Sequence, residues 1–245
     1  MKTHKIAIIL SILIFVISCK SSAGLNDDLV NAVFTGDAAK VKNLVERGAD
    51  VNTIDINSAR KRPVLTIAAI KGFKEIVEYL LNKGANVNLT NSLGATALHA
   101  AAQTKQSQIV ETLLSKGALV NTKAKNGITP LISAIIPGNE EVIKILIQKG
   151  ADVNAKTNRS WTALHIACQR GNAAIAALLV EKADINVQND SGITPLMTAA
   201  RFGHVDIVKL LLQKGAKKDI KTNTGKTAMD VAAAFKKEDI IKLLK

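Results

Sequence analysis

The sequence predicts an all-α solenoid in which short helix pairs stack along one axis. Three observations carry this prediction. A segment with the pattern of Ser191 to Ala216 recurs along the chain at a nearly constant period, which is typical of stacked repeats. Each copy contains two apolar stripes at helical spacing, separated by a turn. The composition is 47% hydrophobic but only 3% aromatic, so the core must consist mainly of Leu, Ile, Val and Ala.

The first residues differ from the repeats. Lys2 and Lys5 precede an apolar run, residues 6–17, which has the charged start and short apolar region of a secretory signal. The run is too short to span a bilayer, which needs about 20 residues. Its end, Val16 to Cys19, resembles a bacterial lipobox, and this implies cleavage before Cys19 and lipid attachment to it. The alternatives are an ordinary cleaved signal or an uncleaved anchor.

These features divide the chain into three parts. We expect a lipoprotein signal peptide over residues 1–18, a lipidated cysteine with a short tether over 19–24, and one repeat domain over 25–245. Five extended residues after Cys19 reach at most about 18 Å, so the repeat domain should sit close to its membrane.

The first repeat is interpreted as an N-terminal cap. It begins with Asp27-Asp28, and acidic residues suit a helix N-terminus. We expect Leu29, Ala32 and Val33 to face the core. The next repeat is three residues longer than the period, and we place the extra residues in a loop over 53–62, where a solenoid tolerates insertion.

The central repeats share one pattern. In Ser191 to Ala216, Thr194-Pro195 opens the first helix, because a threonine hydroxyl caps free N–H groups and proline suits the first turn. Gly203 turns the chain and Gly215 ends the second helix. The positions equivalent to Thr194 are separated by 33, 33, 33, 32 and 33 residues and are Pro63, Thr96, Thr129, Thr162 and, downstream, Thr227.

The fifth repeat departs from this pattern. Its second helix carries Ala173, Ala174, Ala176 and Ala177 where other copies have larger residues. Replacing a packed Leu, Ile or Val with Ala costs about 2–5 kcal/mol where the cavity stays open, so we expect the least stable interface here. Cys168 stands where other repeats have alanine and is interpreted as a small buried hydrophobe; a reactive thiol is the alternative.

Four short runs resemble ankyrin repeats, from roughly residue 25 to the end: TALHAA (Thr96 to Ala101), TALHIA (Thr162 to Ala167), TPLMTAA (Thr194 to Ala200) and GADVN (Gly48 to Asn52, Gly150 to Asn154). The resemblance implies a β-hairpin loop and two antiparallel helices per unit, about seven units including two caps, and a concave side that binds proteins. It also implies that His99 and His165 hydrogen-bond the neighbouring loop.

Motifs for chemistry are not found. No His, Cys, Asp or Glu cluster has metal-ligand spacing, and no Ser/His/Asp arrangement is visible. Gly225-Lys226-Thr227 resembles the end of a phosphate-binding loop, but Ile220 stands where its first glycine would fall. We therefore expect no enzyme, no catalytic or metal site and no cofactor.

The candidate binding residues follow from the repeat register. The resemblance implies that partners contact the hairpin tips and the exposed end of each first helix. Ile128, Trp161 and Ile193 form an uncharged stripe at these positions, and the surrounding positions are mostly basic, with Asp190 as the exception. The alternative is loop packing beside a solvated face. The candidates are Arg60, Arg62, Lys71, Lys125, Ile128, Arg159, Trp161, Arg170, Ile193, Arg201 and Phe202.

The net charge indicates the kind of partner. The formal charge is +13, and loss of Lys2 and Lys5 leaves +11. Such a charge favours acidic partners, and we expect no nucleic acid, because a series of stacking aromatics is absent. The sequence predicts a monomeric, non-enzymatic scaffold, lipid-anchored in a bacterial cell envelope on its periplasmic or surface side, that binds an acidic protein. The alternative is an envelope-organising protein that binds anionic lipid or polymer.

Overall fold

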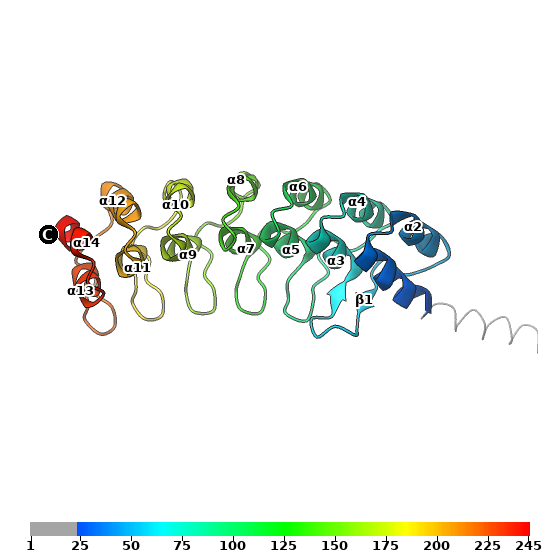
Figure 1. Ribbon diagram of the computed structural model, residues 1–245, viewed down its shortest axis with the longest axis horizontal. Helices are drawn as coiled ribbons and strands as arrows, with labels where there is room; N and C mark the ends of the chain where they lie inside the picture. Colours follow the sequence, from blue (N-terminus) through cyan, green and yellow to red (C-terminus); the bar gives the residue numbers. More distant parts are fainter. Residues whose placement is uncertain (1–23) are drawn as a thin grey trace, which may run out of the picture.

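Antiparallel helix pairs follow one another along the computed structural model, which describes residues 24–245 (Figure 1). The stacked helical architecture expected from the repeat period is confirmed. The pairs are residues 24–35 with α2 (Ala38–Glu46), α3 (Val64–Lys71) with α4 (Lys74–Asn82), α5 (Ala97–Gln103) with α6 (Ser107–Ser115), α7 (Pro130–Ile135) with α8 (Glu140–Gln148), α9 (Ala163–Arg170) with α10 (Ala173–Val180), α11 (Pro195–Phe202) with α12 (Val205–Gln213), and α13 (Ala228–Ala234) with α14 (Glu238–Leu244).

The pairs form a shallow arc. The second helix of each pair lies on the outer side, and the hairpin loops that precede the first helices hang from the inner side (Figure 1). Within residues 24–245, no helix is long and apolar enough to cross a membrane. Lys2, Lys5, the apolar run over 6–17 and Cys19 lie outside the described residues, so the signal and its lipidation stay predictions.

The first helices begin where the sequence places their caps. The Thr129 hydroxyl accepts a hydrogen bond from the Ile132 N–H at 3.3 Å, and the Thr194 hydroxyl accepts one from the Met197 N–H at the same distance. Proline follows both threonines and has no N–H to leave unpaired in the first turn. The local sequence therefore sets the start of each of these helices.

The core runs unbroken through the stack. In the first described helix, Leu29 and Val33 are fully buried and Ala32 nearly so, which confirms the expected inward face of the cap. Two-residue strands β1 (Ile54–Asp55) and β2 (Arg62–Pro63) pair antiparallel in the second repeat. The expected insertion is the loop between them.

Hydrogen bonds join the hairpin loops of successive repeats. The Lys125 N–H donates to the Leu93 carbonyl at 2.9 Å, and the Asn223 N–H donates to the Ser191 carbonyl at 3.1 Å. Gly192 permits this approach: its φ is +73°, and a Cβ there would lie 2.7 Å from the Asn223 nitrogen. These bonds fix the position of each hairpin loop relative to that of the next repeat.

Asparagine side chains in the loops that follow the second helices also join successive repeats. The Asn121 amide oxygen accepts from the Asp152 N–H at 2.8 Å, and its amide nitrogen donates to the Gly150 carbonyl at 3.1 Å. The equivalent asparagines in other repeats also accept an N–H of the next repeat. They are Asn52, Asn88, Asn154 and Asn186. We call this series the asparagine ladder.

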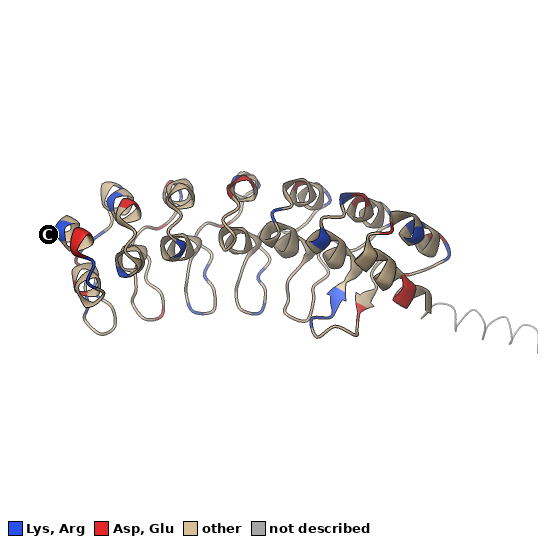
Figure 2. Ribbon diagram, viewed as in Figure 1, with Lys and Arg blue, Asp and Glu red and all other residues tan. Residues whose placement is uncertain are grey.

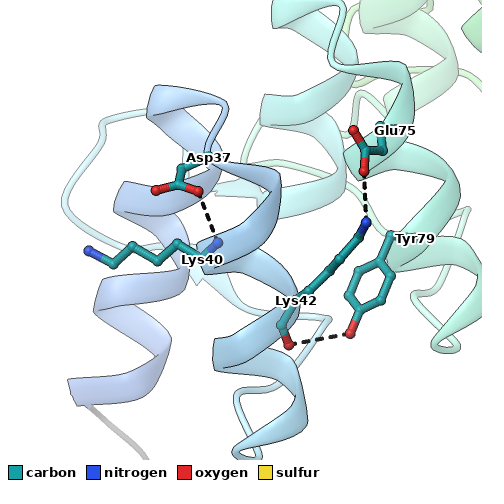
Figure 3. Close-up of polar contacts among 5 residues, drawn as sticks. All are labelled: Asp37, Lys40, Lys42, Glu75 and Tyr79. Atoms are coloured by element: carbon teal, nitrogen blue, oxygen red, sulfur yellow. Dashed lines mark hydrogen bonds and ion pairs between the residues drawn. The ribbon is translucent and has the colours of Figure 1, made fainter.

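The first two repeats have an additional contact on the outer side (Figure 3). The Lys42 ammonium lies 2.7 Å from the Glu75 carboxylate, and the Tyr79 hydroxyl donates to the Lys42 carbonyl at 3.4 Å. The Asp37 carboxylate caps α2 by accepting from the Lys40 N–H at 2.9 Å. The hydrogen bond with Glu75 raises the pKa of Lys42. Because this ion pair is exposed, it aligns the repeats more than it stabilises them.

The fifth repeat corrects one expectation. Ala173, Ala174 and Ala177 are exposed on the outer side of α10, and only Ala176 is buried. Three of the four alanines therefore remove nothing from the core, and the expectation that they thin it is wrong. Ala176 alone replaces the larger residues found at this position in other repeats, such as Ile143.

Candidate functional site

Several hollows open on the inner side of the arc, between the hairpin loops and the first helices, and three of them contain residues of the candidate set. The first, here called the arginine hollow, has a volume of about 230 Å³ and is lined by residues that include Arg60, Arg62 and Thr66. It spans the second to fourth repeats. His99 and Ser133, from α5 and α7, contribute to its lining and are both mostly buried.

The second, the tryptophan hollow, is the largest of the three at about 400 Å³. Arg159 and Trp161 of the fifth hairpin loop line it together with Ile166 of α9. It shares Asn126 and Ile128 with the arginine hollow, so the two are adjacent along the inner side.

The third, the phenylalanine hollow, lies between the sixth and seventh repeats and has a volume of about 220 Å³. Ile193, Arg201 and Phe235 are among its lining residues. The Arg201 guanidinium carbon lies 4.9 Å from the centre of the Phe235 ring and 5.8 Å from that of Phe202. These are cation–π distances, and they hold the arginine beside the apolar lining.

Two buried histidines fix the hairpin loops that form these hollows. Nδ1 of His99 accepts from the Thr96 N–H at 3.2 Å, so Nε2 carries the hydrogen and donates to the Ile128 carbonyl at 3.1 Å. His165 repeats this with Thr162 and with the Ile193 carbonyl, at 3.3 and 3.0 Å. Burial lowers the pKa of both histidines, which keeps their rings neutral. The expected tie from each histidine to the neighbouring loop is confirmed.

Trp161 is partly exposed at the edge of its hollow. The centre of its ring lies 5.5 Å from that of the His165 ring, and the two planes are tilted by 51°, so the histidine packs against the tryptophan. Ile128 and Ile193 are partly buried and pack against the core. They therefore serve loop packing and also line the hollows, whereas Trp161 offers an accessible aromatic surface.

The charged residues that line the three hollows are all basic. The hollows contain Arg60, Arg62, Arg159, Arg201 and Lys226, and the described residues that line them include no Asp or Glu. The outer second helices, in contrast, carry both acidic and basic residues, as Figure 2 shows. The ion pairs among residues 24–245 all use lysine, so the arginines of the hollows keep their charge available.

The structure places the sequence candidates in two groups. Seven line the hollows: Arg60, Arg62, Ile128, Arg159, Trp161, Ile193 and Arg201. The others are exposed beside them. Lys125 is at a hairpin tip, while Lys71, Arg170 and Phe202 end first helices. Lys71 lies over the Phe34 ring at 4.6 Å.

Thr66 and Phe235 are the main site residues that the candidate set lacks. Phe235 occupies the position equivalent to Phe202, one period later, so the register contained its signal. Thr66 stands at the position of His99 and His165 in a repeat whose opening residue is Pro63. That departure from the pattern was also visible in the sequence.

The described chain contains no group of three or more His, Cys, Asp or Glu that could hold a metal ion. Cys168, the free cysteine of this part, is fully buried in the core, and burial raises the pKa of its thiol. A thiol in this state is a poor nucleophile, and its placement fits a small core residue.

Comparison with known proteins identifies the repeat. The family model described as ankyrin repeats matches in three copies, over residues 29–124, 118–189 and 175–245. Among solved structures, the ankyrin repeat domain of Bcl-3, a member of the IkappaB protein family, superimposes with a TM-score of 0.75 at 25% identity. The match covers 87% of this chain and 97% of that domain.

Similar curated proteins share only part of their length with this chain. Palmitoyltransferase Hip14 of Drosophila melanogaster is 40% identical over 77 residues, 31% of this chain and 12% of the relative. The B-cell lymphoma 3 protein homolog of Mus musculus is 42% identical over 71 residues, 29% and 15% respectively. Ankyrin repeat and SAM domain-containing protein 6 of Rattus norvegicus is 45% identical over 69 residues, 28% and 8%.

Proposed function

The chain belongs to the ankyrin repeat family, and we propose that it is a non-enzymatic interaction scaffold that binds an acidic segment of a protein partner along its three hollows. The observation that carries the proposal is the basic lining of these hollows. Five basic side chains line the hollows, and the described lining contains no carboxylate. A surface that only needed to be soluble would mix both signs.

The hollow at the N-terminal end shows the opposite chemistry. Asp27 and Asp55 line it, with no Lys or Arg among its described lining residues. The basic character of the other three is therefore not a general property of the surface. Complementary charge steers an acidic partner toward these three hollows and fixes its orientation.

Apolar side chains supply the contact area within the basic surround. Trp161, Phe235 and Leu93 line the hollows, and each is partly exposed. Trp and Arg are enriched among the residues that dominate binding energy, and removal of such a residue costs about 2 kcal/mol or more. We therefore assign the central contact to Trp161.

The same proposal includes a membrane location. Lys2 and Lys5, the apolar run over 6–17 and Cys19 support a lipid-anchored protein of a bacterial envelope, on its periplasmic or surface side. One chain of this kind would act as a monomer whose hollows lie near the membrane.

Chemical cross-linking in intact cells, followed by pull-down, tests the function. Wild type is compared with Trp161→Ala and with Phe34→Ala, a matched control because Phe34 is 48% exposed but lies at the N-terminal hollow. We expect one specific protein to be lost with Trp161→Ala, with its affinity reduced about 30-fold or more, and retained with Phe34→Ala.

A second arm separates the alternative function. Purified protein is added to vesicles of phosphatidylglycerol or of phosphatidylcholine at several salt concentrations. Binding to the anionic vesicles that is unaffected by Trp161→Ala and weakens only with salt, together with no partner in cells, would replace the scaffold by an envelope-organising role.

A further inference from the structure

We propose that the arginine hollow is the subsite that receives a carboxylate of the partner, held by the Thr66 hydroxyl and the guanidinium groups of Arg60 and Arg62. The inference rests on the proposed function and specifies which of the hollows reads the acidic group. The ligand class is a peptide that carries an Asp or Glu side chain or a free C-terminal carboxylate.

The position of Thr66 in the repeat explains why its hydroxyl is available. In the third, fifth and seventh repeats, the side chain at this position accepts a hydrogen bond from the N–H of the residue that caps the helix. His99 and His165 do so with their Nδ1 atoms, and the Asp230 carboxylate accepts from the Thr227 N–H at 2.8 Å. The cap of α3 is Pro63, which has no N–H.

The second usual partner is also out of reach. His99 and His165 extend to a carbonyl of the next hairpin loop, and the equivalent carbonyl for Thr66 belongs to Ala95. A threonine side chain is too short for this bond. Thr66 is only 2% exposed, and its hydroxyl oxygen has no hydrogen-bond partner among residues 24–245.

The missing imidazole also leaves space. Thr66 and Ala95, both smaller than the residues at the equivalent positions of the fifth repeat, line the arginine hollow together. A buried hydroxyl that lacks a partner is unfavourable, so a ligand oxygen that accepts its hydrogen is bound more tightly. The hollow therefore combines room with an unused donor in its wall.

The charge of the hollow selects the kind of oxygen. Arg60 is exposed and Arg62 half-buried at its rim, and within the described chain neither lies in an ion pair. A guanidinium group binds a carboxylate through two parallel hydrogen bonds, which gives direction as well as charge. His99, in the same lining, is kept neutral because burial lowers its pKa, so the positive charge is that of the arginines.

The neighbouring hollow defines the rest of the ligand. The arginine and tryptophan hollows share Asn126 and Ile128, but Thr66 belongs to the second repeat and Trp161 to the fifth, three packing distances of roughly 8–10 Å apart. An extended peptide advances about 3.3 Å per residue. A carboxylate at Thr66 and an apolar side chain at Trp161 are thus about eight residues apart in the partner.

Peptide selection with matched variants tests the subsite. Random peptides are displayed in one library as internal segments and in another with free C-termini, and both are selected on the wild-type protein. We expect enrichment of Asp or Glu about eight residues from an apolar residue in the internal library if a side chain is read. Enrichment confined to the second library would instead identify a terminal carboxylate.

Affinities of a selected fluorescent peptide then isolate the hydroxyl. Thr66→Val keeps the shape of the side chain, and we expect it to weaken binding several-fold without lowering the melting temperature. A peptide in which the residue that supplies the carboxylate is replaced by an apolar residue without an acceptor should bind wild type and Thr66→Val equally. Thr66→His should restore the bond to the Ala95 carbonyl, raise the melting temperature and block the hollow.

The outcomes separate the two proposals. Peptides that depend on Trp161 but bind Thr66→Val and Thr66→His as tightly as wild type would overturn the subsite and leave the proposed function standing. If neither library yields a peptide that depends on Trp161, the proposed function and the subsite both fail.

Discussion

At the scale of single residues, His99 and His165 carry the connection between helix and hairpin loop. Each ring uses one nitrogen to cap its own helix and the other to hold the next repeat. Both roles require a neutral ring with its hydrogen on Nε2. The array therefore depends on the protonation state of these two side chains.

This dependence predicts a loss of stability in mild acid. Burial lowers the pKa of both histidines in the folded protein, while an unfolded histidine keeps a pKa near 6.5. Protons therefore bind the unfolded chain preferentially as the pH falls below about 6.5. The free energy of unfolding should decrease by up to about 1.4 kcal/mol per pH unit and histidine, until the lowered pKa is reached.

Urea unfolding between pH 7.5 and 5.5 measures this effect. The double variant His99→Gln with His165→Gln should be less stable at pH 7.5 but should lose less stability on acidification. An identical pH dependence in wild type and the double variant would show that other groups cause it.

Sequence reasoning succeeded at residues whose role is set within the repeat. The histidine bonds, the threonine caps and the burial of Cys168 follow from local position. The residue type of Trp161 and its position in the repeat mark it as a candidate in the sequence. Its contact with the His165 ring depends on how the hairpin loop folds onto α9. Thr66 was overlooked because its availability arises from an absent N–H on Pro63 and an absent imidazole.

At the scale of elements, the asparagine ladder sets the spacing between repeats. Each asparagine side chain of the ladder accepts a hydrogen bond from a backbone N–H of the next repeat, and each joins only one repeat to the next. The GADVN run that marks the repeat in the sequence thus ends with the residue that aligns the following repeat.

Asn121 offers the clearest test of the ladder. Asn121→Ala removes two hydrogen bonds to the fourth repeat, to the Asp152 N–H and the Gly150 carbonyl, and should lower the free energy of unfolding by about 1–2 kcal/mol. Asn121→Asp keeps the acceptor and should lose less. Chemical denaturation followed by circular dichroism measures both, and an alanine variant as stable as wild type would exclude this role.

Element boundaries were predictable because caps and glycines recur with the period. The faces of α10 were not. Its alanine-rich sequence is apolar on all sides, so period alone did not show that Ala173, Ala174 and Ala177 point outward. Contact with α8 and α12 decides which side is buried, and that information lies in the neighbouring repeats.

At the scale of the whole molecule, the expected lipid anchor lies close in sequence to the repeat array that carries the hollows. The described array begins at residue 24, and Cys19 lies five residues before it in the chain. A lipid on that cysteine would hold the hollows near the membrane. Attachment by several acyl chains is stable where one is marginal.

Substitution of Cys19 tests this arrangement in cells. We expect wild type in the membrane fraction and labelled by an alkyne analogue of palmitate. Cys19→Ala should lose the label and appear in the soluble fraction or as unprocessed precursor, while Cys168→Ala, the matched control, should behave as wild type. Membrane association and labelling that survive Cys19→Ala would exclude the lipobox interpretation.

The bonds between hairpin loops and those of the asparagine ladder both join only adjacent repeats. Small changes in the angle between adjacent repeats therefore add up along the array. The phenylalanine hollow shares no lining residue with the other two, so more joints separate it from them. We expect a partner long enough to reach all three hollows to favour one curvature of the array.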